Sequence, residues 1–290
     1  MKFPQHYATG SPVISVEIGP PKTDQEYAEL ERRLPALAGL AAPLFHVAYA
    51  ARPSSRRFAL ELAGKLREVY GKDVASHVTC VAATAADIDA LLDELARIGV
   101  ENVVALRGKP PRGHSQFLAP PGGFAHAEQL VAHIRRRGGF SIGVAGHVEK
   151  HPESPNAASD LEHLKNKIRA GADVIFTQFF YDNQVFYRFV EQCRAGGIDL
   201  PIVPSLLPIL DAAQGLALAE AFGVSVPPAL RTDLQVAHKD PTLVRRIGIE
   251  HAIRQARDLL AHGVCGIHFH SLNQPEPMMQ ILWRLTTPGA

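Results

Sequence analysis

Short apolar runs alternate with longer amphipathic stretches along the chain, and this alternation predicts a regular order of strands and helices. The first run, VISVEIG at 13–19, predicts a strand, and the helical periodicity at 23–40 predicts a helix whose Thr23 and Glu26 are spaced as a capping box. The same pattern predicts further strands at 44–50, 75–81, 102–108, 141–147, 174–181, 202–208 and 266–272. It predicts further helices at 54–71, 84–99, 124–138, 157–172, 183–197, 212–223, 241–262 and 275–285.

Eight strand–helix units in 290 residues indicate an α/β protein, and they favour a single (β/α)8 TIM barrel. Strands as apolar as these suit a parallel sheet that helices cover. No GxGxxG follows the first strand, which argues against an open dinucleotide-binding sheet. No break in composition marks a second domain, so we expect residues 1–290 to form one catalytic barrel.

Composition narrows the classes of partner. The formal net charge is +1, which argues against nucleic acid or a membrane surface as the main partner. The dense basic run 133–137 falls at the end of a predicted helix, where cations suit the helix dipole. The three cysteines are far apart and form no CxxC, and the N-terminal segment has no apolar signal core, so we expect a cytoplasmic protein without disulfides.

In a (β/α)8 barrel the functional residues lie at the carboxyl ends of the strands. The polar residues predicted at those ends are Glu17, Tyr49, His77, Thr79, Arg107, Lys109, His147, Gln178, His268, His270 and Asn273.

Glu17 is the most informative of these residues because it interrupts an apolar strand. A carboxylate there must be paired, be solvated in a cavity or carry chemistry, and a raised pKa would make it a general acid. The alternative is a structural ion pair. Gln178 lies in VIFTQFFY, where its amide can bind the edge of a flat heterocycle or satisfy a neighbouring backbone group.

Basic residues at other strand ends suggest an anionic ligand. His77 shares a strand face with Thr79, and Arg107 shares one with Lys109. Further along, His151, Asp160, His163 and Lys167 could line an anionic ligand at the start of a helix, or form a solvated helix face. HFH at 268–270 puts two imidazoles on one face, but no HExxH or other recognised ligand spacing occurs, so we predict no metal site.

Nine stretches taken in order resemble the methylenetetrahydrofolate reductases, in particular the short bacterial form. They are SVEIGPP, FHVAYAA, HVTC, VVALRG, HPES, DLEHLKNKIRAGAD, TQFFYD, IVPSLLPI and IHFHSLN, and they extend over about 13–285. The resemblance implies a (β/α)8 barrel and a two-stage reaction. NADH or NADPH reduces bound FAD, and hydride then passes from flavin to methylenetetrahydrofolate, giving methyltetrahydrofolate. It also implies a homo-oligomer.

The resemblance also implies roles for particular residues. Glu17 matches the family's acid, which protonates the folate nitrogen, and Gln178 matches the glutamine that contacts the pterin. The positions that match FAD contacts are Tyr49, Ala51, His77, Arg107, Gly108, Ala125, His151, Asp160 and Lys167.

Several positions depart from the family's pattern. Lys109 stands where an aspartate is usual, near both flavin and folate, and His147 replaces a tyrosine. His163 and Asn166 lie in the altered pyrophosphate motif, and Gln274 replaces an arginine at the substrate side. Ala212 aligns near an expected aromatic residue. Three alternatives therefore stay open: a flavin-free reductase with direct hydride transfer, a non-catalytic folate-binding subunit, or another barrel enzyme such as an aldolase.

Lys109 carries a specific hypothesis. Reduced flavin is negative near N1, and an ammonium there stabilises it by on the order of 1–3 kcal/mol. That is roughly 20–65 mV for a two-electron couple. A flavin that is easier to reduce favours oxidation of methyltetrahydrofolate. The alternative is that Lys109 points into solvent and has no effect.

Overall fold

The computed structural model describes residues 1–21, 23–48, 53–108 and 117–287. Of the residues singled out above, Tyr49, Ala51 and Lys109 lie outside the described residues. In the part of the chain that is described, no helix is both long enough and apolar enough to cross a bilayer.

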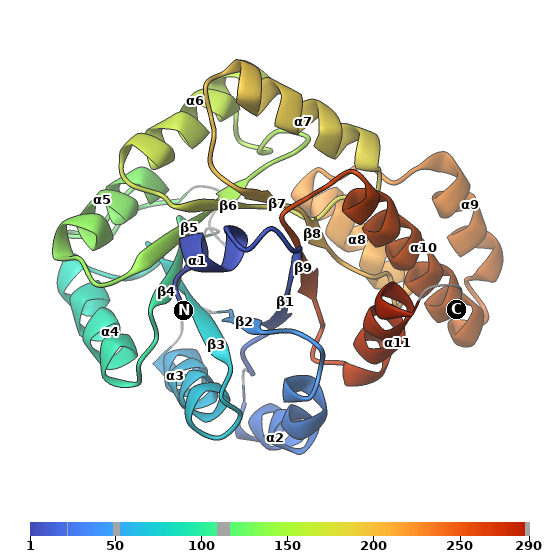
Figure 1. Ribbon diagram of the computed structural model, residues 1–290, viewed down its shortest axis with the longest axis horizontal. Coiled ribbons are helices and arrows are strands. Elements are labelled where there is room, and N and C mark those ends of the chain that lie inside the picture. Colours follow the sequence, from blue (N-terminus) through green and yellow to red (C-terminus); the bar gives the residue numbers. More distant parts are fainter. Residues whose placement is uncertain (22, 49–52, 109–116, 288–290) are drawn as a thin grey trace.

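Nine parallel strands among the described residues form a sheet that closes on itself (Figure 1). They are β1 (Val13–Ile18), β2 (Leu44–Val47), β3 (Asp73–Thr79), β4 (Asn102–Leu106), β5 (Ser141–Gly146), β6 (Val174–Thr177), β7 (Ile202–Val203), β8 (Ser205–Leu206) and β9 (Gly266–His270). β7 pairs with β6 and β8 pairs with β9, so β7 and β8 together close the ring as one interrupted strand. The predicted (β/α)8 barrel is confirmed.

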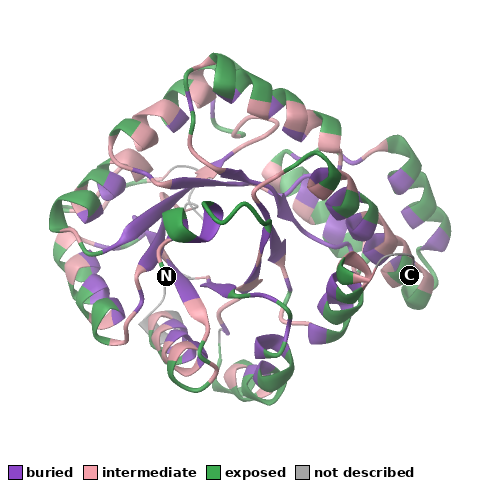
Figure 2. Cartoon of the chain, viewed as in Figure 1, coloured by how far each residue is buried: buried purple, intermediate pink, exposed green. Residues whose placement is uncertain are grey.

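The helices surround this barrel, each with one buried face and one exposed face (Figure 2). They are α2 (Asp24–Ala38), α3 (Pro53–Glu68), α4 (Ala85–Arg97), α5 (Ala127–Arg137), α6 (Ala157–Arg169), α7 (Asn183–Ala195), α8 (Ala212–Phe222), α10 (Pro241–Ala261) and α11 (Pro275–Thr286). Thr23 caps α2 by accepting a hydrogen bond from the Glu26 amide at 3.1 Å, as its spacing predicted. Asp240 likewise caps α10.

Two helices were not predicted. α9 (Pro228–Ala237) follows α8, and its Leu230 and Leu234 pack in an apolar cluster with Ile209 and Val244 outside the barrel wall. α1 (Phe3–Tyr7) lies across the opening at the amino ends of the strands (Figure 1). Five residues are too few for helical periodicity to be visible in a sequence.

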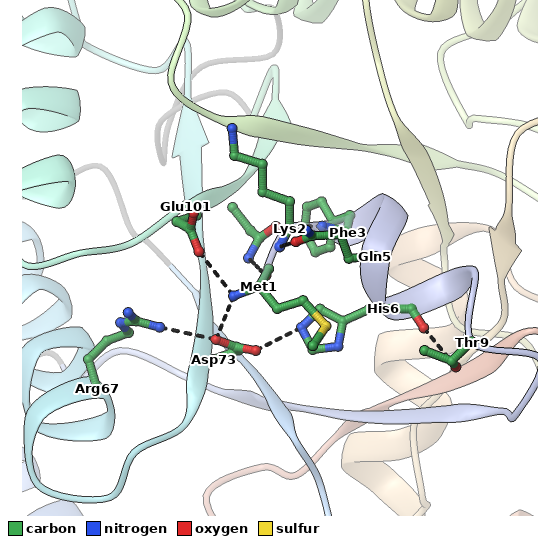
Figure 3. Close-up of polar contacts among 10 residues, drawn as sticks. Met1, Lys2, Phe3, Gln5, His6, Thr9, Arg67, Asp73 and Glu101 are labelled. Atoms are coloured by element: carbon green, nitrogen blue, oxygen red, sulfur yellow. Dashed lines mark hydrogen bonds and ion pairs between the residues drawn. The ribbon is translucent and has the colours of Figure 1, made fainter.

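α1 plugs this end of the barrel through one ring and a set of polar contacts (Figure 3). Phe3 is completely buried and its ring centroid lies 5.3 Å from that of Phe176. The Phe3 amide donates to Asn102 Oδ1 at 2.8 Å. Asp73 lies 2.9 Å from the terminal amino group, and its other oxygen lies 3.1 Å from His6 Nε2. With this end closed, the interior is accessible from the carboxyl ends of the strands.

Candidate functional site

One carboxylate and four imidazoles meet at the carboxyl end of the barrel. Glu17 comes from β1, His46 from β2 and His77 from β3, while His268 and His270 come from β9. In the sheet register Glu17 is paired with His46 on one side and with His270 on the other. Parallel pairing therefore brings together residues that are about 250 positions apart.

These groups form the polar end of a cavity of about 350 Å³. Gln178 also lines it, directly after β6. The rest of the lining is largely apolar and includes Leu106, Phe176, Phe179, Leu207, Leu218, Phe222 and Leu272. A mostly apolar cavity with a few polar groups at one end suits a flat organic ligand.

Glu17 is surrounded by histidines. Its Oε1 lies 3.0 Å from His270 Nδ1, and its Oε2 lies 3.6 Å from His77 Nε2 and 3.7 Å from His268 Nε2. Burial raises the pKa of Glu17, but attraction to His270 and hydrogen bonding to the histidines outweigh it and hold the pKa well below its usual value. The direction is opposite to the raised pKa that would favour a general acid.

The histidines divide into two kinds. Burial lowers the pKa of His270, but the Glu17 carboxylate outweighs burial, so the pKa of His270 is raised. Burial lowers the pKa of His268 to about 4, although Glu17 opposes the shift. Burial, together with the neighbouring histidines, also lowers the pKa of His46. These directions favour an ion pair between the Glu17 carboxylate and a protonated His270, and they favour the neutral form of His46 and His268.

Gln178 is placed where it could meet a ligand, and its side chain also satisfies a neighbouring backbone group. It lines the cavity, and its Oε1 accepts a hydrogen bond from the Phe179 amide at 3.0 Å. Its own amide donates to the Gly146 carbonyl at 2.6 Å. These bonds fix the backbone of Gln178 at the rim of the cavity.

A second cleft of about 270 Å³ lies between β5, α6 and α7. His147, Asp160 and Lys167 line it. Burial lowers the pKa of Lys167 to about 8, opposed by Asp160 and Glu128, and its ammonium donates to the Ala145 carbonyl. Burial and then Lys167 lower the pKa of His147 to about 3. Lys167 lies in the last turn of α6, and a partly buried cation in this cleft suits an anionic group such as phosphate.

The loop before α6 belongs to the same region. The His151 amide donates to Asp160 Oδ2 at 3.1 Å, and the His151 ring lies 4.6 Å from the His147 ring, centroid to centroid. Arg107 forms a bidentate pair with Glu153, with both distances 2.7 Å.

Gly108 has a φ of 85°, and a Cβ there would lie 2.3 Å from Val81 Cγ2, so this position requires glycine.

Other expected site residues lie apart from these two cavities. His163 is exposed on α6. The Ala125 amide donates to Gln129 Oε1 at 2.8 Å, in the first turn of α5. Gln274 Oε1 accepts from Arg245 Nη2 at 2.5 Å and lines neither cavity. His77, by contrast, lines the first cavity, where it lies beside Glu17.

His46 and Ser15 were missed by the sequence analysis. His46 is 1% exposed inside the barrel, and Ser15 Oγ lies 2.9 Å from His268 Nδ1. A polar residue in the apolar run LFHVAYA was the available signal for His46. Serine is too common in strands to have indicated anything.

Comparison with known proteins places this site in a family. The model of the family Methylenetetrahydrofolate reductase matches residues 2–286. Methylenetetrahydrofolate reductase (NADH) 1 of Arabidopsis thaliana is 35% identical over 287 residues, which are 95% of this chain and 48% of that protein. The 5,10-methylenetetrahydrofolate reductase of Pectobacterium carotovorum subsp. carotovorum is 32% identical over 264 residues, 91% of this chain and 86% of that protein. The chain thus spans about half the length of the plant relative.

Among solved structures, an uncharacterized protein from Clostridium thermocellum that binds two copies of 5-methyl-5,6,7,8-tetrahydrofolic acid superposes with a TM-score of 0.66. It is 15% identical and covers 98% of this chain and 99% of its own, a likeness that shows the fold alone. The family match and the curated relatives confirm the resemblance found in the sequence motifs. The chain belongs to the methylenetetrahydrofolate reductase family.

Proposed function

We propose that this protein is a methylenetetrahydrofolate reductase that transfers hydride between NADH or NADPH and the methylenetetrahydrofolate/methyltetrahydrofolate pair through FAD. One observation carries the proposal: Glu17 and Gln178 line the same largely apolar cavity at the carboxyl end of the barrel. The family membership and the names of the relatives support the reaction class.

In this proposal the pterin occupies the cavity. Gln178 binds the polar edge of the ring, and Phe179, Leu207 and Phe222 contact its faces. Glu17, hydrogen-bonded to His270, exchanges a proton with the reacting folate nitrogen. The apolar lining excludes water from this proton transfer.

The residues of the second cleft fit a dinucleotide diphosphate. The partly buried Lys167 ammonium and the amino end of α6 supply positive charge, while Asp160 can accept hydrogen bonds from ribose hydroxyls. Bound FAD would supply the two-electron hydride carrier between nicotinamide and folate. Tyr49, Ala51 and Lys109 keep their expected cofactor roles as part of this proposal, as does Gln274 at the substrate side.

Family membership also supports proposals about domain organisation, cellular location and oligomeric state. We propose that the barrel acts as one catalytic unit, that it works in the cytoplasm and that it forms a homo-oligomer. The plant relative is named for NADH, which favours NADH as cosubstrate.

An absorption spectrum of the purified protein tests the proposal. We expect flavin bands that bleach when methyltetrahydrofolate is added without oxygen. Glu17→Gln should retain the flavin bands but slow the bleaching by about 10²–10⁴-fold, the range of a lost general acid or base. Glu68→Gln, at an exposed position on α3, is the matched control and should bleach like the wild type.

Each alternative has its own outcome. A colourless protein that still reduces methylenetetrahydrofolate with NADH would be a flavin-free reductase. A protein that binds folate without any turnover, with Glu17→Gln making no difference, would be a binding subunit.

A further inference from the structure

We propose that Glu17, His268 and His270 also form a binding site for a divalent transition-metal ion such as Zn²⁺. One carboxylate oxygen and one ring nitrogen from each histidine all lie within 4.8 Å of one another. No metal site was expected from the sequence because it contains no HExxH or other recognised ligand spacing, and Glu17 is more than 250 residues from His270. The inference goes beyond the proposed reductase function and does not depend on it.

The distances between donor atoms suit a small metal ion. Zinc bonds of 2.0–2.2 Å in a tetrahedron put neighbouring donor atoms about 3.3 Å apart. Glu17 Oε1 lies 3.0 Å from His270 Nδ1, and Glu17 Oε2 lies 3.7 Å from His268 Nε2. These two distances, one to each oxygen of the carboxylate, bracket the ideal one.

The ligands are held by rigid elements and by a supporting hydrogen bond. Glu17 and His270 are paired in the register of adjacent strands, as are Ser15 and His268. Ser15 Oγ lies 2.9 Å from His268 Nδ1, and this contact leaves Nε2 as the ring nitrogen that faces Glu17. Metal-binding histidines usually have their second ring nitrogen bonded in this way.

An independent observation at the same place is the orphaned nitrogen of His46. The ring is 1% exposed, lines the same cavity and lies 4.2 Å from the His268 ring, centroid to centroid. Its Nε2 is buried without a hydrogen-bond partner among the described residues. Such a group is destabilising unless something satisfies it. A water bound to a metal ion in this cluster would supply the missing hydrogen bond.

The donor set indicates the class of ion. Two imidazoles and one carboxylate suit Zn²⁺, Co²⁺ or Fe²⁺, whereas Mg²⁺ and Ca²⁺ prefer oxygen ligands alone. Three protein ligands leave a further position open toward the cavity. Because the ion takes the Glu17 carboxylate, metal binding and proton transfer by Glu17 exclude each other.

Metal titration of the full-length protein, without an affinity tag and stripped with a chelator, tests the proposal. With Co²⁺ we expect visible d–d absorption that saturates at one ion per chain, and Zn²⁺ should displace the Co²⁺. His270→Ala should weaken binding by at least about 100-fold, and Ser15→Ala by about 10–100-fold, the usual effect of losing a supporting hydrogen bond. His262→Ala, an exposed histidine near Asp258 on α10, is the matched control and should bind like the wild type.

Three results would overturn the proposal: no Co²⁺ or Zn²⁺ binding by the wild type, binding by His270→Ala equal to that of the wild type, or displacement of Co²⁺ by millimolar Mg²⁺. Circular dichroism of each variant checks that it is folded. If His270→Ala does not fold, Ser15→Ala serves as the test variant. An enzyme that reduces folate but binds no metal contradicts this inference alone. A protein that binds the metal but shows no folate turnover after the metal has been removed by a chelator contradicts only the proposed function.

Discussion

At the scale of single residues, Glu17 shows how an ionised group is accommodated inside a barrel. Its side chain is 18% exposed, yet both oxygens face histidine nitrogens. A buried carboxylate without such partners would take up a proton or destabilise the fold. The histidines therefore determine the ionisation of Glu17, and strand register determines which histidines reach it.

Lys167 carries a prediction about pH. Its pKa of about 8 means that the ammonium is charged below pH 8 and loses its proton above it. If the diphosphate of FAD binds beside it, affinity should fall by about 10–100-fold as pH rises from 7 to 10, the loss of one charge-assisted hydrogen bond. Flavin fluorescence quenching measures this. Lys167→Arg stays charged throughout and should show little of this decline, and an equal decline in both proteins contradicts the assignment.

Lys109 carries a prediction that rests on charge and on the family's aspartate at this position. Lys109→Asp should lower the flavin midpoint potential by roughly 20–65 mV or more, because a carboxylate disfavours the anionic reduced flavin. Lys109→Gln should give an intermediate value. Redox titration against a reference dye measures all three potentials, and an unchanged or higher potential in Lys109→Asp removes the hypothesis.

At the scale of elements, the break between β7 and β8 shows how a proline is accommodated in a closed sheet. Pro204 has no amide hydrogen to donate, but its carbonyl accepts from the His268 amide at 2.9 Å. The next amide, that of Ser205, donates to the Thr177 hydroxyl at 3.0 Å. The ladder is thus interrupted without leaving the Ser205 amide unpaired, and the chain then turns toward α8 at the rim of the cavity.

Helix α10 gives a prediction about stability. A Cβ on Gly248 would lie 1.7 Å from the Ile209 carbonyl oxygen, so the helix and the segment after β8 are in direct backbone contact. Gly248→Ala should lower the free energy of unfolding by at least about 2 kcal/mol. Gly64→Ala on α3, where a Cβ meets nothing within 4 Å, should raise it by about 0.5–1 kcal/mol. Urea unfolding measures both, and effects of the same sign contradict the packing described.

At the scale of the whole molecule, the two ends of the barrel have different tasks. α1 and its polar network close the amino end, where Phe3, Tyr7 and Phe176 fill the interior. The carboxyl end holds the histidine cluster and both cavities. The chemistry we propose thus lies at the end of the barrel opposite the plug, where the fold rule predicts it.

The plug at the amino end gives a prediction about acid stability. Burial lowers the pKa of His6, although Asp73 opposes the shift. As pH falls below about 6.5, the unfolded chain binds a proton at His6 more readily than the folded chain does. The free energy of unfolding should therefore fall, by at most about 1.4 kcal/mol per pH unit from this group.

His6→Gln should have a shallower loss of stability than the wild type between pH 6.5 and 5. His238→Gln, exposed at the end of α9, should match the wild type. Chemical unfolding at several pH values measures the three slopes. A wild-type slope equal to that of His6→Gln contradicts the role given to His6.

The sequence by itself determined the order of elements, the (β/α)8 class and the family, because apolar periodicity, caps and strand-end motifs are local properties of the chain. It also placed Glu17 and Gln178 at strand ends, since period-two alternation assigns each side chain to one face. The short helix α1 and the break in the sheet at Pro204 were not predicted from the sequence, because tertiary packing rather than local propensity forms them.

Only the tertiary structure decided which side chains meet. Ser15 and His268 are 253 residues apart, and Glu17 and His270 are equally distant, so no spacing rule connects them. The hydrogen bond from Arg107 to Glu153 and the exposure of His163 to solvent are likewise not predictable from spacing in the sequence. Register between parallel strands sets these contacts, and the contacts in turn lower the pKa of Glu17, because proximity to histidines outweighs burial.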